Sequence, residues 1–181
     1  MSDDINDIKK LRMPVFSWDY EDLSEADRWF FMARAYFDCS YYLFAQMVQE
    51  CFDRNYHRAL VAVFLFEHSV ELFLKAAVIQ AGRTNVPSHD LEKLYRQYCR
   101  LYPGKKYQFQ GEIASIVTFK SNTPHNEFAR YPVHNSGRPW PGYSHVDVAI
   151  WFVRLDDFGK DFDRLEPLMK ERYPSEIRSD S

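Results

Sequence analysis

The stretch Ala59-Leu60-Val61-Ala62-Val63-Phe64-Leu65-Phe66 is apolar at every position and lies in a longer segment that begins near Tyr56 and stops at Gly82. A helix that is apolar on all sides is normally buried among other helices. Glycine adopts the left-handed conformation that ends many helices, so Gly82 is a suitable C-terminal boundary. The sequence therefore predicts a central helix over 56–82, buried in a helical bundle.

One polar stripe runs along this apolar helix, because Glu67, Glu71 and Lys75 are spaced four residues apart. Glu71 precedes Lys75 in the orientation that favours an ion pair one helical turn long. Buried charges are unfavourable unless they are paired, so the stripe either reaches solvent or lines a polar interface. Glu71 and Lys75 are accordingly candidates either for structural pairing or for the wall of a binding site.

Further helices are predicted from apolar residues that recur every three or four positions. Their ranges are 24–53, 88–101, 110–119 and 144–167. Ser24, with Asp27 three residues later, is the expected cap of the first, and Ser88 and Ser144 are the expected caps of the third and fifth. Pro103-Gly104 ends the third helix, and Pro167 is expected to break or end the last one.

The segment 120–143 contains four prolines and two glycines, which exclude regular structure. Long irregular connections in compact domains are often functional. The predicted fold is therefore all-α, an antiparallel up-and-down bundle of about five helices with one long Pro-rich loop before the last helix. The expected organisation is an N-terminal arm at 1–22, a bundle domain at 23–172 and a tail at 173–181.

Composition limits the partners of this chain. The hydrophobic share is 46%, the charged share is 27% and the formal net charge is −3. Proteins that bind nucleic acids strongly carry a basic excess or a separate basic face, so any contact with nucleic acid must be local. Aromatic residues make up 17% of the chain, and they fit either a Phe-rich core or a surface that binds a partner.

The sequence also predicts a cytoplasmic location without membrane contact. The apolar stretches are shorter than the roughly 20 residues of a membrane-spanning helix. The first residues, Met1-Ser2-Asp3-Asp4, are acidic where a signal peptide is basic. Cys39, Cys51 and Cys99 are odd in number and have no CxxC spacing, which is typical of reduced thiols.

Two parts of the chain resemble the HEPN superfamily of small helical bundles. They are 68–77 (HSVELFLKAA) followed by Gly82 and 88–94 (SHDLEKL), and the triplet Arg130-Tyr131-Pro132 in the loop. The resemblance implies a homodimer, and many members act in toxin–antitoxin, antiviral or RNA-processing systems. It also implies that a catalytic member would be a metal-independent endoribonuclease, with an Arg-x4-6-His motif near the start of the last long helix.

The loop supplies the candidates for such chemistry. Histidine moves protons near neutral pH, and arginine stabilises charge that develops on a phosphate. Arg130 and His134 are separated by three residues, whereas Arg138 and His145 are separated by six, with Pro139 after the arginine. These four are the candidate catalytic residues. The candidate binding residues, besides Glu71 and Lys75, are His125, Asn126 and Tyr131.

Arg83 and His89 also have a permitted spacing, but they lie in a different inter-helix turn. His68 and His89 lie inside the segments that carry the family resemblance, so both are predicted to be structural. No metal ligand set, such as HExxH or a Cys/His cluster, is present in the sequence, and no cofactor is expected.

The predicted function is a HEPN-type protein that acts on or with RNA, as a metal-independent endoribonuclease of a toxin–antitoxin or defence system if it is catalytic. The expected partners are a second copy of the chain, an RNA or nucleotide, and an antitoxin or other protein. The alternative is a non-catalytic HEPN-like module that binds a partner protein or a small ligand.

Overall fold

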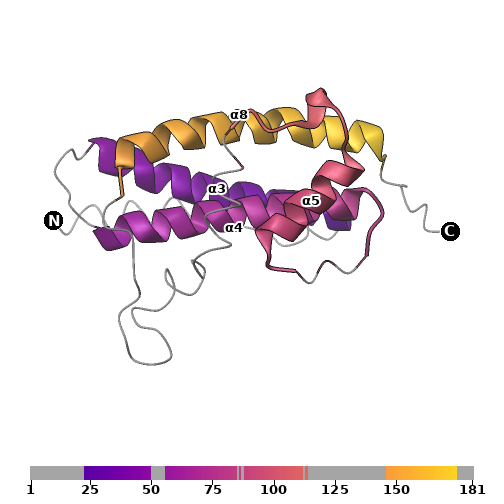
Figure 1. The fold of residues 1–181 in the computed structure, drawn as a ribbon. Coiled ribbons are helices and arrows are strands. Elements are labelled where there is room, and N and C mark those ends of the chain that lie inside the picture. The colour runs from indigo at the N-terminus through magenta and orange to yellow at the C-terminus, as the bar shows by residue number, and fades with distance from the viewer. Residues whose placement is uncertain are drawn as a thin grey trace, which may run out of the picture.

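The computed structural model describes residues 23–49, 56–84, 86, 88–111, 113 and 146–174. Figure 1 shows these residues as a helical assembly, in which no strand occurs. The elements are α3 (Glu25–Gln49), α4 (Tyr56–Gln80), α5 (Leu91–Leu101), the 3-10 helix η2 (Lys105–Tyr107) and α8 (Val148–Arg172). The all-α prediction is confirmed, whereas most of the predicted helix 110–119 and all of the loop 120–143 lie outside the described residues.

The N-terminus of α3 is capped as predicted. The Ser24 hydroxyl accepts a hydrogen bond from the Asp27 backbone N–H at 3.1 Å and donates one to the Asp27 carboxylate at 2.6 Å. Partial burial opposes ionisation of Asp27, but hydrogen bonds from Lys170 and Ser24 outweigh it and lower the pKa of Asp27. The cap therefore also ties the start of α3 to the end of α8, through the Lys170–Asp27 ion pair at 2.6 Å.

The central position of α4 is confirmed. Its C-terminal half is buried on every side, and residues 70–78 are all classed as buried. The helix ends as the sequence predicts, because Gly82 has a φ of +76° and its N–H donates to the Ile79 carbonyl at 2.8 Å. The chain then turns back along the bundle toward α5.

Paired contacts fix the relative directions of the three long helices. Asp27 and Arg34 of α3 pair with Lys170 and Asp163 of α8, so these helices are antiparallel. Ser40 of α3 donates to the Ala62 carbonyl, and Phe30 contacts Phe73, so α3 is also antiparallel to α4. In contrast, α4 and α8 run in the same direction, with Phe66 against Phe158 and Phe73 against Phe162.

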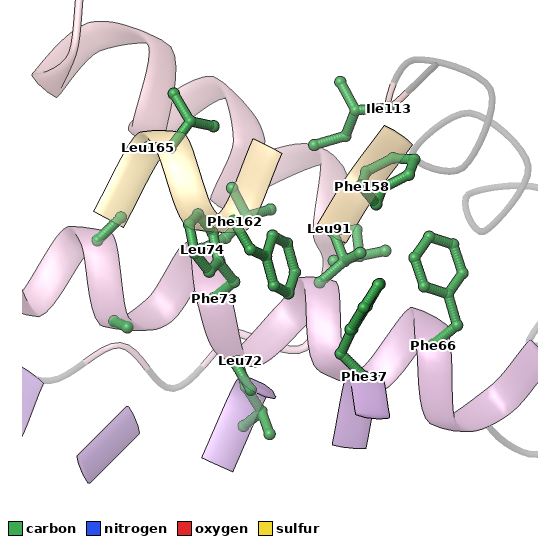
Figure 2. Close-up of a cluster of buried hydrophobic side chains, with 14 of the residues drawn as sticks. Phe37, Phe66, Leu72, Phe73, Leu74, Leu91, Ile113, Phe158, Phe162 and Leu165 are labelled. Carbon is green, nitrogen blue, oxygen red and sulfur yellow. The ribbon is translucent and has the colours of Figure 1, made fainter. Parts of the chain in front are cut away.

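A cluster of phenylalanine rings lies in the core between these helices. Figure 2 shows Phe37 of α3, Phe66 and Phe73 of α4, and Phe158 and Phe162 of α8 gathered in one cluster. Phe73 and Phe162 are stacked with ring centroids 4.0 Å apart, and Phe30 meets Phe73 edge to face at 5.3 Å. The Phe-rich core that composition allowed is therefore present.

Two predicted helix boundaries are wrong. The N-cap of α5 is Asp90 rather than Ser88, because the Asp90 carboxylate accepts from the Lys93 N–H at 3.1 Å while Ser88 only accepts from the Asp90 N–H. Pro167 does not end the last helix, which continues to Arg172. Pro167 is exposed, and the buried Leu165 and Met169 hold the helix against the bundle on both sides of it.

The start of the last helix also differs from the prediction. Asp147 is the N-cap of α8, and its carboxylate accepts from the Ile150 N–H at 3.0 Å. The sequence predicts the cap three residues earlier, at Ser144, which lies outside the described residues. The predicted helix 24–53 is described only up to Gln49, and the predicted arm at 1–22 lies outside the described residues.

Candidate functional site

The polar stripe of α4 is part of a buried charged cluster. Lys75 Nζ lies 2.9 Å from Glu71 Oε1, and both side chains are almost fully buried. The ammonium also lies 5.7 Å from the centre of the Trp29 ring of α3, within the range of a cation–π interaction. The predicted pairing of Glu71 with Lys75 is therefore observed, and the pair faces the protein interior.

A third residue joins the cluster from outside α4. His89, in the segment before α5, places Nδ1 2.9 Å from the same Oε1 of Glu71. The side chain of His89 is 72% exposed, whereas that of Glu71 is 4% exposed. The cluster thus connects a buried carboxylate to an imidazole that reaches solvent.

The hydrogen bond also determines which nitrogen of His89 is available. The Glu71 carboxylate oxygen accepts from the Lys75 ammonium, and in a hydrogen bond from His89 to the same oxygen the donor is the Nδ1–H group. In the neutral ring the lone pair is then on Nε2. A fixed carboxylate behind one imidazole nitrogen is the arrangement in which the other nitrogen can take up a proton from a bound molecule.

A second feature is a basic cleft on the outer face of α5, with a volume of ≈ 400 Å³. We call it the α5 cleft; it is lined by Arg83, Lys93, Arg96, Gln97, Arg100 and Leu101. The spacing of 93, 96, 97 and 100 puts these residues on one helical face. The opposite face packs on the bundle through Leu91, Leu94 and Tyr98.

The charges of the α5 cleft are only partly balanced. Lys93 pairs with Asp90 at 3.4 Å, and Arg96 pairs with Glu92. Within the described part of the chain, Arg83 and Arg100 have no carboxylate within 4.0 Å. The cleft therefore carries a local excess of positive charge in a chain whose formal net charge is −3.

The buried cluster and the α5 cleft meet at the start of α5. His89 directly precedes Asp90, which accepts from the Lys93 N–H and pairs with the Lys93 ammonium. The hydrogen bond from the Lys93 backbone, more than any other contact, lowers the pKa of Asp90. Asp90 thus remains ionised and holds Lys93, a cleft residue, within one helical turn of His89.

The described residues contain only part of the predicted site. Arg130, His134, Arg138, His145, His125, Asn126 and Tyr131 all lie outside them. Glu71 and Lys75 are brought together as expected. His68 lies between two aromatic rings, 4.6 Å from Tyr36 and 5.9 Å from Phe64, as a structural histidine would.

His89 is the residue whose environment the sequence did not reveal. The sequence predicts only a structural role for His89, whereas in the structure its imidazole contacts the buried Glu71. The two are 18 residues apart, so no helical spacing relates them. The only signal was that a carboxylate on an apolar helix needs more than one hydrogen-bond donor.

No group of three or more His, Cys, Asp or Glu side chains among the described residues could hold a metal ion. Within the same residues, no helix is both long enough and apolar enough to cross a membrane. No family model, curated protein or solved structure matches the chain. The family resemblance stays a prediction, and function has to be inferred from the charged cluster and the α5 cleft.

Proposed function

We propose that this chain is a HEPN-type domain that binds RNA and holds its phosphate backbone in the α5 cleft. The observation that carries the proposal is the unbalanced positive charge of the cleft, where Arg83 and Arg100 face no carboxylate among the described residues. Arginine binds phosphate oxygens through paired hydrogen bonds, which makes such a cleft suited to a polyanion. The resemblance of 68–94 to HEPN proteins supports RNA as that polyanion.

The cleft also favours backbone contacts over base recognition. The described residues that line it include no aromatic ring on which a base could stack. Phosphate contacts position a strand but do not read its sequence. The proposed activity is therefore binding with little sequence preference, and in its enzymatic form metal-independent cleavage within a toxin–antitoxin or defence system.

Removing the two unbalanced arginines should weaken RNA binding and its salt dependence. For single-stranded RNA, log K falls with log salt concentration with a slope of about −0.7 per phosphate contact, so four cleft cations predict a slope of about −2.8. In the double variant R83Q/R100Q the slope should fall to about −1.4, with an affinity loss of about tenfold to a hundredfold at low salt. Fluorescence anisotropy with a labelled single-stranded RNA in EDTA measures both quantities.

The matched control is K105Q/K106Q, which removes the same charge from two exposed positions within η2. Equal losses in the two double variants would show that only net charge matters and would reject the cleft. Absence of RNA binding by the wild-type protein would reject the function itself. In that case the non-catalytic interaction module becomes the better proposal.

An exposed apolar surface on α3 supports the non-catalytic interaction module. We propose this surface also as the site of homodimer formation. Four large apolar side chains of α3 are exposed: Phe31 at 60%, Met32 at 41%, Tyr42 at 62% and Val48 at 39%. Phe31 and Tyr42 are 11 residues apart, which is close to three helical turns, so they share one face. Exposed apolar groups on one helix face are typical of surfaces that contact another protein.

We expect the wild-type chain, of 21.6 kDa, to be a dimer at tens of micromolar and the variant F31S/Y42S to be a monomer. Light scattering after size-exclusion chromatography gives both masses. The control I150S/V153S changes two exposed apolar residues of α8 and should remain dimeric. A monomeric wild-type protein, or a dimeric F31S/Y42S variant, would contradict this assignment.

A further inference from the structure

His89 has the contacts of a residue that transfers protons, although its sequence position predicts only a scaffold role. We propose that His89 is the proton acceptor in the cleavage of an RNA strand held in the α5 cleft, with Glu71 as its positioning residue. This inference rests on the proposed function and names the group that would perform its chemistry. The group that accepts the proton would then lie at the start of α5 and not in the Arg/His pairs of the loop.

The first support is the environment of Glu71. A carboxylate with a 4% exposed side chain is unfavourable in a core unless several donors satisfy it. Lys75 and His89 both reach Oε1 at 2.9 Å, so the carboxylate is contacted by the ammonium on one side and fixes the orientation of the imidazole on the other. A residue that only shielded Glu71 from water would itself be buried, whereas the His89 side chain is 72% exposed.

The second support is the position of His89 at the start of α5, the helix whose outer face lines the cleft. Asp90 follows His89 and pairs with Lys93, which is one of the residues that line the α5 cleft. A strand whose phosphates contact Arg96 and Arg100 along the helix would pass Lys93 before it reaches the helix N-terminus.

The reaction needs no group beyond those of the protein, the RNA and water. The 2′-hydroxyl gives its proton to Nε2 of His89, and the 2′-oxygen attacks the adjacent phosphorus. A bond from the 2′-oxygen to phosphorus forms, and the bond from phosphorus to the 5′-oxygen breaks. The leaving 5′-oxygen takes a proton from water, and the hydroxide that remains takes the proton from His89 Nε2, which restores the neutral imidazole. The products are a 2′,3′-cyclic phosphate and a 5′-hydroxyl. Lys93 or a cleft arginine stabilises the charge that develops on the phosphate.

The decisive variant is His89→Asn. The asparagine amide nitrogen can replace Nδ1 as the donor to Glu71, but the side chain has no nitrogen that accepts a proton. Cleavage of single-stranded RNA in EDTA should fall by about 10²- to 10⁴-fold in kcat, whereas RNA affinity should stay within about twofold of wild type. The thermal unfolding midpoint should also match wild type.

Two further variants separate chemistry from structure. His89→Ala should lose the same activity, and added imidazole should restore part of it because the free base can enter the vacated space. His57→Ala, which removes another exposed histidine at the start of α4, should keep full activity. Cleavage that survives in His89→Asn, or a loss in His89→Ala that imidazole does not relieve, would overturn the proposal.

The same experiment distinguishes failure of this inference from failure of the proposed function. If the wild-type protein does not bind RNA, both the proposed function and the role of His89 are rejected. Wild-type protein that binds RNA without cleaving it would leave the binding function and reject proton transfer by His89. Cleavage that depends on Arg130 and His134, or on Arg138 and His145, but not on His89, would place the chemistry in the loop.

Discussion

Replacing Phe73 by alanine should lower the free energy of unfolding by about 3–5 kcal/mol, the range observed for large aromatic residues removed from cores. Phe73 is 1% exposed and packs on Phe162, Phe30 and Phe109 with centroid distances of 4.0, 5.3 and 5.9 Å. Its ring therefore joins α3, α4 and α8 to the segment after η2. Removal of the ring leaves a cavity, because no neighbouring helix can restore the lost contacts without moving as a whole.

Chemical denaturation followed by far-ultraviolet circular dichroism measures this loss. The control is Val153→Ala on α8, a 63% exposed residue whose truncation should change the free energy of unfolding by no more than about 0.5 kcal/mol. If Phe73→Ala were as stable as this control, Phe73 would not be at the centre of the bundle.

The second large effect is expected at the buried ion pair. Replacing Glu71 by leucine should cost about 3–5 kcal/mol, because it leaves the Lys75 ammonium in the interior without its carboxylate. The lysine side chain is 6% exposed, and the Trp29 ring alone does not replace a full charge. Converting Lys75 to methionine in the same chain should recover most of the loss, since buried ion pairs can often be replaced by apolar residues of similar size.

A double-mutant cycle of Glu71→Leu, Lys75→Met and the combined variant measures the coupling. An exposed pair of the same spacing serves as the control, because Lys160 and Asp156 of α8 are 2.6 Å apart at the surface. Asp156→Ala should affect stability far less, as is usual for exposed ion pairs. Additive effects at Glu71 and Lys75 would show that the two charges are not paired in the folded protein.

The sequence predicted the elements that depend on local chemistry. The cap at Ser24, the central position of α4 and the terminating role of Gly82 follow from hydrogen-bonding side chains, apolar periodicity and glycine conformation, and each is confirmed. The prediction failed at Pro167, where packing outside the segment decides the outcome. The carbonyl of Asp163 loses its helical donor there, but Asp163 is exposed and water can satisfy that oxygen.

The site was less predictable than the fold, because it depends on which segments meet in space. The pairing of Glu71 with Lys75 was visible as a spacing of four residues, but His89 reaches Glu71 only because the chain after Gly82 turns back along α4. The α5 cleft likewise combines Arg83, from the connection, with Lys93, Arg96 and Arg100 from the helix. The composition indicated that any basic site must be local, but it did not indicate where in the fold that site lies.

The burial of α4 bears on how this chain can change during evolution. The residues 68–77 carry much of the family resemblance and include the most buried part of the bundle. Almost any substitution there would leave a cavity or a buried charge without its partner. We therefore expect the sequence of α4 to change little among related chains. Residues that determine what the protein binds should vary more, on α5 and on the outer face of α3. Two related chains could share an almost unaltered central helix and still differ in what they recognise.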